Sequence, residues 1–328
     1  IDQRNAGASV TPTNAGYTLD RWLTYISPLG KYTVQQDAGA VTPPVGFTNY
    51  LGVTSTSAYS VTSGDYFSIT QSIEGYNVAD LAWGTADAKT VTLSFWVYSS
   101  LTGTFGGSLR NSAANRSYPF TYTILVADTW EQKSITVSGD TTGTWLTTNG
   151  NGVSLNFGLG VGSTRSGTAG SWAAANYLSA TGATSVVGTS GATFYITGVQ
   201  LEKSSTATEF ESRPYGTELA LCQRYVKVYG GGDPYEYLGI GAVLSGTQVL
   251  MVLPISMRAV PSVTVSAAGN WGLGNATTQA VTSVTIGNSS PRAAGIMLVV
   301  SSGLTNGHAV YVRGNNTTAA RLTLSAEL

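Results

Sequence analysis

The stretch Val153-Ser154-Leu155-Asn156-Phe157-Gly158-Leu159 decides the fold class of this chain. Its odd-numbered positions are apolar, and its even-numbered positions are small or polar. An alternation with period two predicts a β-strand, because successive side chains of a strand point to opposite faces. The pattern therefore predicts a strand with one buried face, in a sheet that packs on one side.

Strand patterns recur on both sides of this stretch. Thr90–Tyr98 (TVTLSFWVY) has more apolar positions, which predicts a central strand buried on both faces with Trp96 mostly in the core. Many short strands without a helical period between them indicate a β-sandwich or jelly roll over residues 15–211. Its other predicted strands are Tyr66–Ile73, Phe120–Val126, Glu131–Val137 and Thr193–Lys203.

A short helix is predicted after Arg213-Pro214, with Thr217 as its cap and Glu218 in its first turn. It forms a linker at 212–225, and residues 1–14 are expected to be an N-terminal connector. Strands then resume and indicate a second compact β-sandwich domain at 226–328. These strands are Tyr225–Tyr229, Tyr237–Val243, Gln248–Leu253, Ser262–Ser266, Val281–Ile286, Gly295–Val300, His308–Arg313 and Arg321–Ser325.

The composition excludes several classes of function. Charged residues make up 10% of the 328 residues, and the net charge is −1. Nucleic-acid binding needs a basic face, so no nucleic-acid partner is expected. There is no apolar run of about 18 residues, so no membrane insertion is expected. A surface poor in charge and rich in Gly, Ser, Thr, Tyr and Trp suits neutral polar partners such as sugars, although displayed all-β scaffolds in general share this composition.

The residues that chemistry requires are scarce. His308 is the only histidine and has Asn306-Gly307 beside it, which indicates a turn and not a catalytic triad. One histidine with one cysteine cannot supply the ligands of a zinc site. A glycosidase needs two facing carboxylates, and Glu74 with Asp80, or Asp233 with Glu236, would be the candidate pairs. We expect no enzyme and no cofactor.

Candidate ligand-binding residues lie in loops of the second domain. Trp271 sits among glycines in Ala267–Gly274, beside Asn270. Its ring would stack on a sugar or anchor a partner, or else fold back onto its own domain or a neighbouring subunit. The other candidates are aromatic or hydrogen-bonding residues in nearby loops, namely Tyr235, Tyr237, Asn306, His308 and Asn315.

Several separated phrases resemble bacteriophage tail-fibre proteins and phage-derived bacterial adhesins. The opening Ile1–Asn5 and Tyr17–Trp22 resemble the start of such proteins. Ile196–Tyr229 (ITGVQLEKSSTATEFESRPYGTELALCQRYVKVY) is similar to their best-known internal signature, and Leu253–Pro261 resembles a distal-domain phrase. LSFWVYSSLTGTFGGSLRN and GDTTGTW are similar to their sandwich domain. The resemblance covers most of residues 1–261.

This resemblance implies a carbohydrate-binding-module-like jelly roll, a linking helix, a distal tip and assembly into a parallel homotrimer. Within the signature, Glu202, Glu209, Glu211 and Arg213 are an unusual cluster for a chain with so few charges. They would fix the exit of the linker through a network with arginines, or hold a structural calcium ion through carboxylates.

The sequence therefore predicts a non-enzymatic fibre-tip adhesin, extracellular or on a virion. It would bind a bacterial surface glycan, with three copies supplying avidity. The alternatives are a structural shaft or spacer without its own ligand, and a polysaccharide-degrading tail spike.

Overall fold

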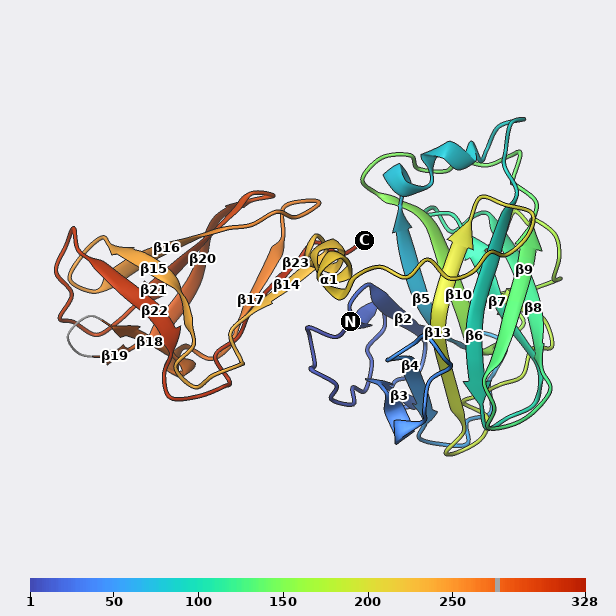
Figure 1. The fold of residues 1–328 in the computed structure, drawn as a ribbon, viewed down its shortest axis with the longest axis horizontal. Coiled ribbons are helices and arrows are strands. Elements are labelled where there is room, and N and C mark those ends of the chain that lie inside the picture. The colour runs from blue at the N-terminus through green and yellow to red at the C-terminus, as the bar shows by residue number, and fades with distance from the viewer. Residues whose placement is uncertain (275–277) are drawn as a thin grey trace. The chain divides into compact units, whose positions relative to one another are not determined.

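The computed structural model describes residues 1–274 and 278–328 (Figure 1). Its contacts divide the chain into two units, Ile1–Arg213 with the terminal Leu328, and Pro214–Glu327. Strands predominate, which confirms the predicted all-β fold; the described residues contain one α-helix, α1 (Tyr215–Gln223). No helix in the described ranges is both long and apolar enough to cross a membrane.

The first unit is a sandwich of two antiparallel sheets (Figure 1). Phe95, Phe157 and Phe194 are fully buried in the core between them. The six-stranded sheet has the order β1 (Gly16–Leu19), β2 (Trp22–Ile26), β5 (Tyr66–Glu74), β10 (Asn151–Val161), β7 (Gly103–Arg110) and β8 (Ser117–Ile124). The five-stranded sheet has the order β3 (Tyr32–Gln36), β4 (Leu51–Ser55), β13 (Thr193–Glu202), β6 (Val91–Ser99) and β9 (Glu131–Val137).

The deciding stretch lies in β10, and both of its faces are buried, so the expectation of one buried face is wrong. Ser108 on β7 donates to Tyr177, in the segment that leads into the short strand β12 (Ser179–Ala180), which pairs with β11 (Ser166–Gly167). Asn156 can be buried because both ends of its side-chain amide are hydrogen-bonded. Its Nδ2 donates to Ser108 Oγ at 3.0 Å, and its Oδ1 accepts from Thr70 Oγ1 at 2.7 Å.

Strand β6 matches its prediction over residues 91–95, which are buried on both faces, and differs from it at Trp96 and Tyr98. Phe95 and Val97 point into the core with at most 1% of their surface exposed, whereas Trp96 and Tyr98 point outward and are partly buried. Trp96 is therefore not a core residue. In the second half of the strand, the apolar run concealed a period-two alternation, because the two outward residues there are aromatic.

The first fourteen residues and α1 depart from their predictions in detail. Val10 forms a β-bridge with Val34, so the expected connector packs on the first unit. Helix α1 begins at Tyr215 with Pro214 as its N-cap, and Thr217 lies inside the first turn instead of capping it. Proline suits the start of a helix because the missing N–H would have no partner there. Short 3-10 helices occur at Ala38–Ala40, Gly75–Asn77, Ala79–Leu81 and Ala268–Asn270.

The second unit is also a sandwich. Met251, Leu273, Val312 and Leu324 are buried between its two sheets. The three-stranded sheet has the order β14 (Val226–Tyr229), β23 (Leu322–Ser325) and β17 (Ser262–Val265). The seven-stranded sheet has the order β19 (Thr278–Ala280), β18 (Trp271–Gly274), β22 (Ala309–Gly314), β15 (Tyr237–Val243), β16 (Gln248–Pro254), β21 (Ala293–Val299) and β20 (Ser283–Ser290). The eight predicted strands are present, and β18 and β19 were not predicted.

Candidate functional site

The strand order gathers five of the seven predicted ligand-binding residues at one end of the seven-stranded sheet. Tyr237 on β15 pairs with Arg313 on β22, and Trp271 on β18 pairs with Gly314. Three further candidates lie next to these positions in the chain, namely Tyr235, Asn270 and Asn315. Asn306 and His308 precede the start of β22, so they lie at the opposite end, where both are exposed. The seven residues therefore do not form one site.

The structure corrects the prediction for Trp271. The residue is 2% exposed and packs in the core of the second unit, which is the fold-back alternative. Its indole N–H points at the carbonyl of Ser266 at 3.4 Å. Ala267–Gly274 is not a binding loop, because its second half is strand β18. Trp271 and Leu273 face the core, and Gly272 and Gly274 occupy the opposite face of the strand. Its ring is not available to stack on a ligand.

Asn270 and Asn315 lie together, and their hydrogen bonds connect the loop before β18 to the loop after β22. The backbone N–H of Asn315 donates to the carbonyl of Asn270 at 2.8 Å. Their side-chain amides donate to the carbonyls of Ala319 at 3.3 Å and Gly269 at 3.1 Å. These bonds give both asparagines a structural role in the loops. The two amide groups were predicted to bind a ligand, and in the structure they bind backbone carbonyls.

Tyr235 and Tyr237 form an exposed group with two residues that were not singled out from the sequence, Tyr311 and Arg313. The guanidinium carbon of Arg313 lies 5.1 Å from the ring centre of Tyr235 and 5.9 Å from that of Tyr237. Tyr237 and Tyr311 meet edge to face with ring centres 5.3 Å apart. The three tyrosines are 45%, 62% and 52% exposed. We call these four residues the tyrosine cluster.

Local structure explains how the chain presents the tyrosine cluster. Val310 and Val312 point into the core, so Tyr311 and Arg313 point outward from β22. The loop before β15 is fixed by its own carboxylates: Asp233 accepts from the backbone N–H of Tyr235 at 2.9 Å, and Glu236 accepts from that of Gly232 at 2.8 Å. Hydrogen bonds from an aspartate side chain to nearby backbone N–H groups are a common way to order a turn, and Glu236 adds a second bond of this kind.

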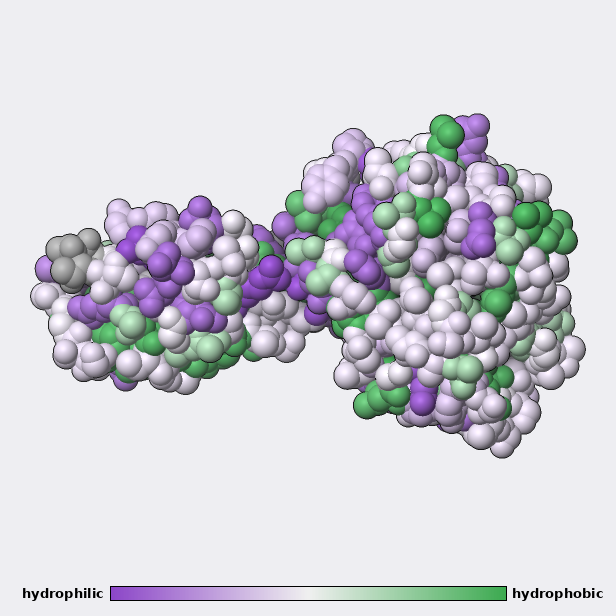
Figure 2. All heavy atoms as spheres, turned by 90° about the horizontal axis from the view of Figure 1, so that it is seen from below, coloured by the Kyte–Doolittle hydropathy of each residue, from purple (hydrophilic) through white to green (hydrophobic). Residues whose placement is uncertain are grey.

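The tyrosine cluster continues into an apolar surface. Ile240 pairs with Tyr311 across β15 and β22 and is 63% exposed. Val252 on the neighbouring strand β16 is 56% exposed. Figure 2 shows a surface that is mostly pale, of intermediate hydropathy, with separate green apolar patches on both units. Exposed large apolar groups that lie side by side mark interaction sites more often than single ones do.

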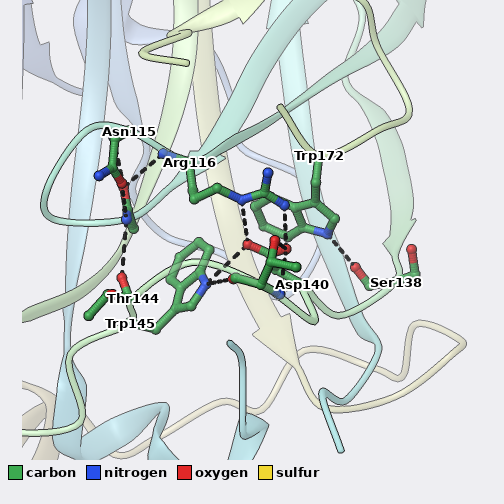
Figure 3. Close-up of polar contacts among 9 residues, drawn as sticks. Asn115, Arg116, Ser138, Asp140, Thr144, Trp145 and Trp172 are labelled. Atoms are coloured by element: carbon green, nitrogen blue, oxygen red, sulfur yellow. Dashed lines mark hydrogen bonds and ion pairs between the residues drawn. The ribbon is translucent and has the colours of Figure 1, made fainter. Parts of the chain in front are cut away.

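A second arginine with aromatic neighbours lies in the first unit (Figure 3). Trp83, Trp145 and Trp172 contact one another edge to face with ring centres 4.8–5.3 Å apart. Arg116 lies over Trp172 at 6.0 Å and forms a two-pronged ion pair with Asp140, with contacts of 2.9 and 2.5 Å. We call these five residues the tryptophan cluster.

The indole N–H groups of Trp145 and Trp172 and the carboxylate of Asp140 have partners inside the protein (Figure 3). The indole N–H of Trp145 donates to Asp140 at 3.2 Å, and that of Trp172 donates to the carbonyl of Ser138 at 2.8 Å. Burial by itself would raise the pKa of Asp140, but hydrogen bonds from Arg116, Thr142 and Trp145 outweigh it and lower that pKa. The tryptophan cluster therefore fastens loops of the sandwich together.

A third aromatic group lies on the outer face of the five-stranded sheet. Tyr98 and Tyr195 stack with ring centres 5.3 Å apart, and Tyr50 and Trp130 adjoin them. Tyr50 and Tyr195 are each 3% exposed, so this group is a small core of its own. Burial raises the pKa of both of these tyrosines. Trp96 lies one outward position along β6 and keeps part of its ring at the surface.

The predicted glycosidase pairs have other partners in the structure. Glu74 is fully buried, whereas Asp80 is exposed and forms an ion pair with Lys203. Asp233 and Glu236 accept from backbone N–H groups of their own loop. No group of three His, Cys, Asp or Glu side chains that could hold a metal ion occurs in the ranges that the structure describes.

The acidic cluster after β13 orders the segment that follows this strand. Glu202 accepts from the backbone N–H and the hydroxyl of Thr208, both at 2.8 Å. Glu211 lies 3.9 Å from Arg213 in an exposed ion pair. These contacts fit the predicted role in fixing the exit from the sandwich.

No protein-family model matches the chain, and no curated protein sequence does. Distant similarities to solved structures exist. A family 4 carbohydrate-binding module is 14% identical with a TM-score of 0.31, over 60% of this chain and 95% of that one. A family 11 carbohydrate-binding module from Clostridium thermocellum, in complex with a mixed-linked tetrasaccharide, is 13% identical with a TM-score of 0.30, over 60% and 97%.

The enzymatically active domain of bacteriophage CBA120 tailspike protein 4 is also similar, with 14% identity and a TM-score of 0.31. The match covers 55% of this chain and only 19% of that longer one. At such low identities and TM-scores, no function passes from these proteins to this chain.

Proposed function

We propose that this chain is a non-catalytic glycan-binding protein, and that the tyrosine cluster is its binding surface. One observation carries the proposal: at one end of the sheet, Arg313 lies against two exposed tyrosine rings, and a third exposed tyrosine contacts one of them. Aromatic rings pack on the C–H faces of sugars, and tyrosine also offers a hydroxyl for hydrogen bonding. Arginine donates up to five hydrogen bonds in a fixed geometry, which suits the hydroxyls of a sugar.

The setting we propose is a fibre tip outside the cell or on a virion, with bacterial surface polysaccharide as the partner. A single small site of this kind binds a sugar weakly. Three copies in a homotrimer would raise the overall affinity because the second and third contacts become intramolecular. Size-exclusion chromatography with light scattering should therefore give a trimer mass for the intact chain.

The test is binding of the intact chain to an array of bacterial surface polysaccharides, with a double variant Tyr237→Ala and Tyr311→Ala. We expect the double variant to bind at least about tenfold more weakly, because exposed aromatic residues at the centre of a site carry much of its binding energy. Tyr76→Ala is the matched control, since Tyr76 is 63% exposed in the first unit. It should leave binding unchanged.

Two outcomes would contradict the proposal. A well-folded protein that binds no polysaccharide would be a structural spacer. A protein whose double variant binds as tightly as the unaltered chain would have its binding surface elsewhere, and Trp96 would be the next residue to replace because it is partly exposed on the outer face of the first unit.

A further inference from the structure

We infer that the bound glycan carries an anionic group, a carboxylate or a phosphate, and that Arg313 selects for it. The inference rests on the proposed glycan-binding function and adds the chemical class of the ligand. It starts from a count of charges. Arg313 is the sole charged residue in the seven strands of its sheet, as the structure describes them.

Arg313 has no carboxylate partner among the residues that the structure describes. Its hydrogen bond to protein runs from Nη2 to Oγ1 of Thr278. Its other contacts are the rings of Tyr235 and Tyr237. The Nε atom is shielded from solvent and has no acceptor, so Nη1 and the second hydrogen of Nη2 are the donors left for a ligand.

The two acidic residues nearest in sequence to the cluster are committed to other bonds. Asp233 accepts from the backbone N–H of Tyr235, and Glu236 accepts from that of Gly232. A second cation lies against the same loop, because a Cβ atom added to Gly231 would come within 2.6 Å of Nε of Arg321. These hydrogen bonds leave both carboxylates charged, so two acids and two arginines lie near this loop. Within the described residues, the acids accept from backbone N–H groups and form no ion pair with Arg313.

The strand next to Arg313 carries glycine at the positions that face it. Gly272 lies opposite Arg313 on β18, and Gly274 lies opposite Tyr311. Glycine places no side chain on the outer face, and a Cβ atom added to Gly274 would lie 3.7 Å from Nε of Arg313. Both glycines are themselves buried, so the absence of side chains on this strand lets Arg313 lie close against its backbone.

These features favour an anion over a neutral sugar. A guanidinium held against aromatic rings is partly removed from water, which strengthens its attraction to a negative group. Its planar donors match a carboxylate or phosphate better than a single hydroxyl. The tyrosine rings would then bind the sugar ring while Arg313 pairs with its acidic substituent.

The experiment uses the intact chain and matched soluble ligands. Galactose oligomers and galacturonic acid oligomers of the same linkage and length differ only in the carboxylate, and mannose 6-phosphate against mannose tests a phosphate. Titration calorimetry should show that an acidic member binds at least about tenfold more tightly than its neutral counterpart, and that salt reduces this preference. The pair that shows the preference identifies the anion.

Arg313→Met should remove that preference by weakening the acidic member at least about tenfold more than the neutral one, because methionine keeps an apolar chain but has neither the charge nor the planar donors. Arg292→Met is the matched control, since Arg292 is an exposed arginine beside β21 in the same unit. It should keep the preference. Equal binding of acidic and neutral members by the unaltered chain, or an acidic preference that survives Arg313→Met, overturns this inference and leaves the glycan-binding function standing. No binding of any oligosaccharide, on these ligands and on the polysaccharide array, rejects both.

Discussion

Arg116 and Arg313 both lie against aromatic rings, but they differ in their polar partners: Arg116 binds a carboxylate, and Arg313 binds a hydroxyl. Each guanidinium lies over aromatic rings, Arg116 at 6.0 Å from Trp172 and Arg313 at 5.1 Å from Tyr235. Arg116 pairs with Asp140, whose side chain is 2% exposed, whereas Arg313 meets no carboxylate in the described part of the chain. Where the protein supplies the anion, the aromatic group holds the fold together. At Arg313 the protein supplies no such anion in the described residues, and the tyrosine rings beside it are exposed.

The same contrast separates aromatic residues within the second unit. Trp271 and Tyr237 lie at the same end of the seven-stranded sheet, yet Trp271 is 2% exposed and Tyr237 is 62% exposed. Burial of an indole ring stabilises the unit, whereas an exposed phenol ring contributes little until something covers it. The distinction can be tested, because replacing a buried ring should lower stability, whereas replacing an exposed ring should lower ligand binding.

The largest effect is expected for Trp271→Ala. The substitution removes a fully enclosed ring and leaves a cavity, which costs about 3–5 kcal/mol of unfolding free energy. Urea unfolding followed by circular dichroism would measure it. Tyr237→Ala is the comparison and should change stability little, since its ring is mostly in water. A Trp271→Ala protein of unaltered stability that has lost glycan binding would place the ring at the ligand, contrary to the structure.

A somewhat smaller effect is expected for Asp140→Asn, which makes the tryptophan cluster resemble the tyrosine cluster. It leaves Arg116 beside tryptophan without its anion, and breaking such an enclosed pair costs about 3 kcal/mol. The sandwich should unfold at lower denaturant concentration, with glycan binding unchanged. Asp80→Asn is the control, because its pair with Lys203 is exposed on both sides. Equal stability of the two variants would show that the tryptophan cluster does not fasten the loops.

Much of the fold could be predicted because period-two alternation follows directly from strand geometry, as β5, β9 and β22 illustrate. Strand β18 was missed because Gly272 and Gly274 resemble a turn, although their alternation with Trp271 and Leu273 was already visible. Glycine on the outer positions lowers strand propensity but does not prevent pairing inside a sheet.

The site was less accessible to sequence reasoning. Tyr235 and Tyr237 were found because a glycine-rich loop carries them. Arg313 was missed, since what distinguishes it from Arg116 is the absence of a nearby acid among the described residues, and that depends on distances in space. The separation of Asn306 and His308 from the tyrosine cluster follows from the antiparallel pairing of β15 and β22, which the sequence does not specify.

The smallest effect on stability, and the sharpest test of the comparison, is expected for Thr278→Glu. Arg313 donates to Thr278, so a carboxylate at this position can reach the guanidinium and turn the tyrosine cluster into a paired one. Because Thr278 is exposed on β19, the new pair should add no more than about 0.5 kcal/mol to stability. It should weaken binding of the acidic oligosaccharide by about tenfold, because the ligand must displace an internal anion.

Thr278→Gln, with the same length and no charge, should retain the acidic preference. If Thr278→Glu binds the acidic ligand as tightly as Thr278→Gln does, then Arg313 does not hold the anion, and the difference between the two arginines has no bearing on ligand choice.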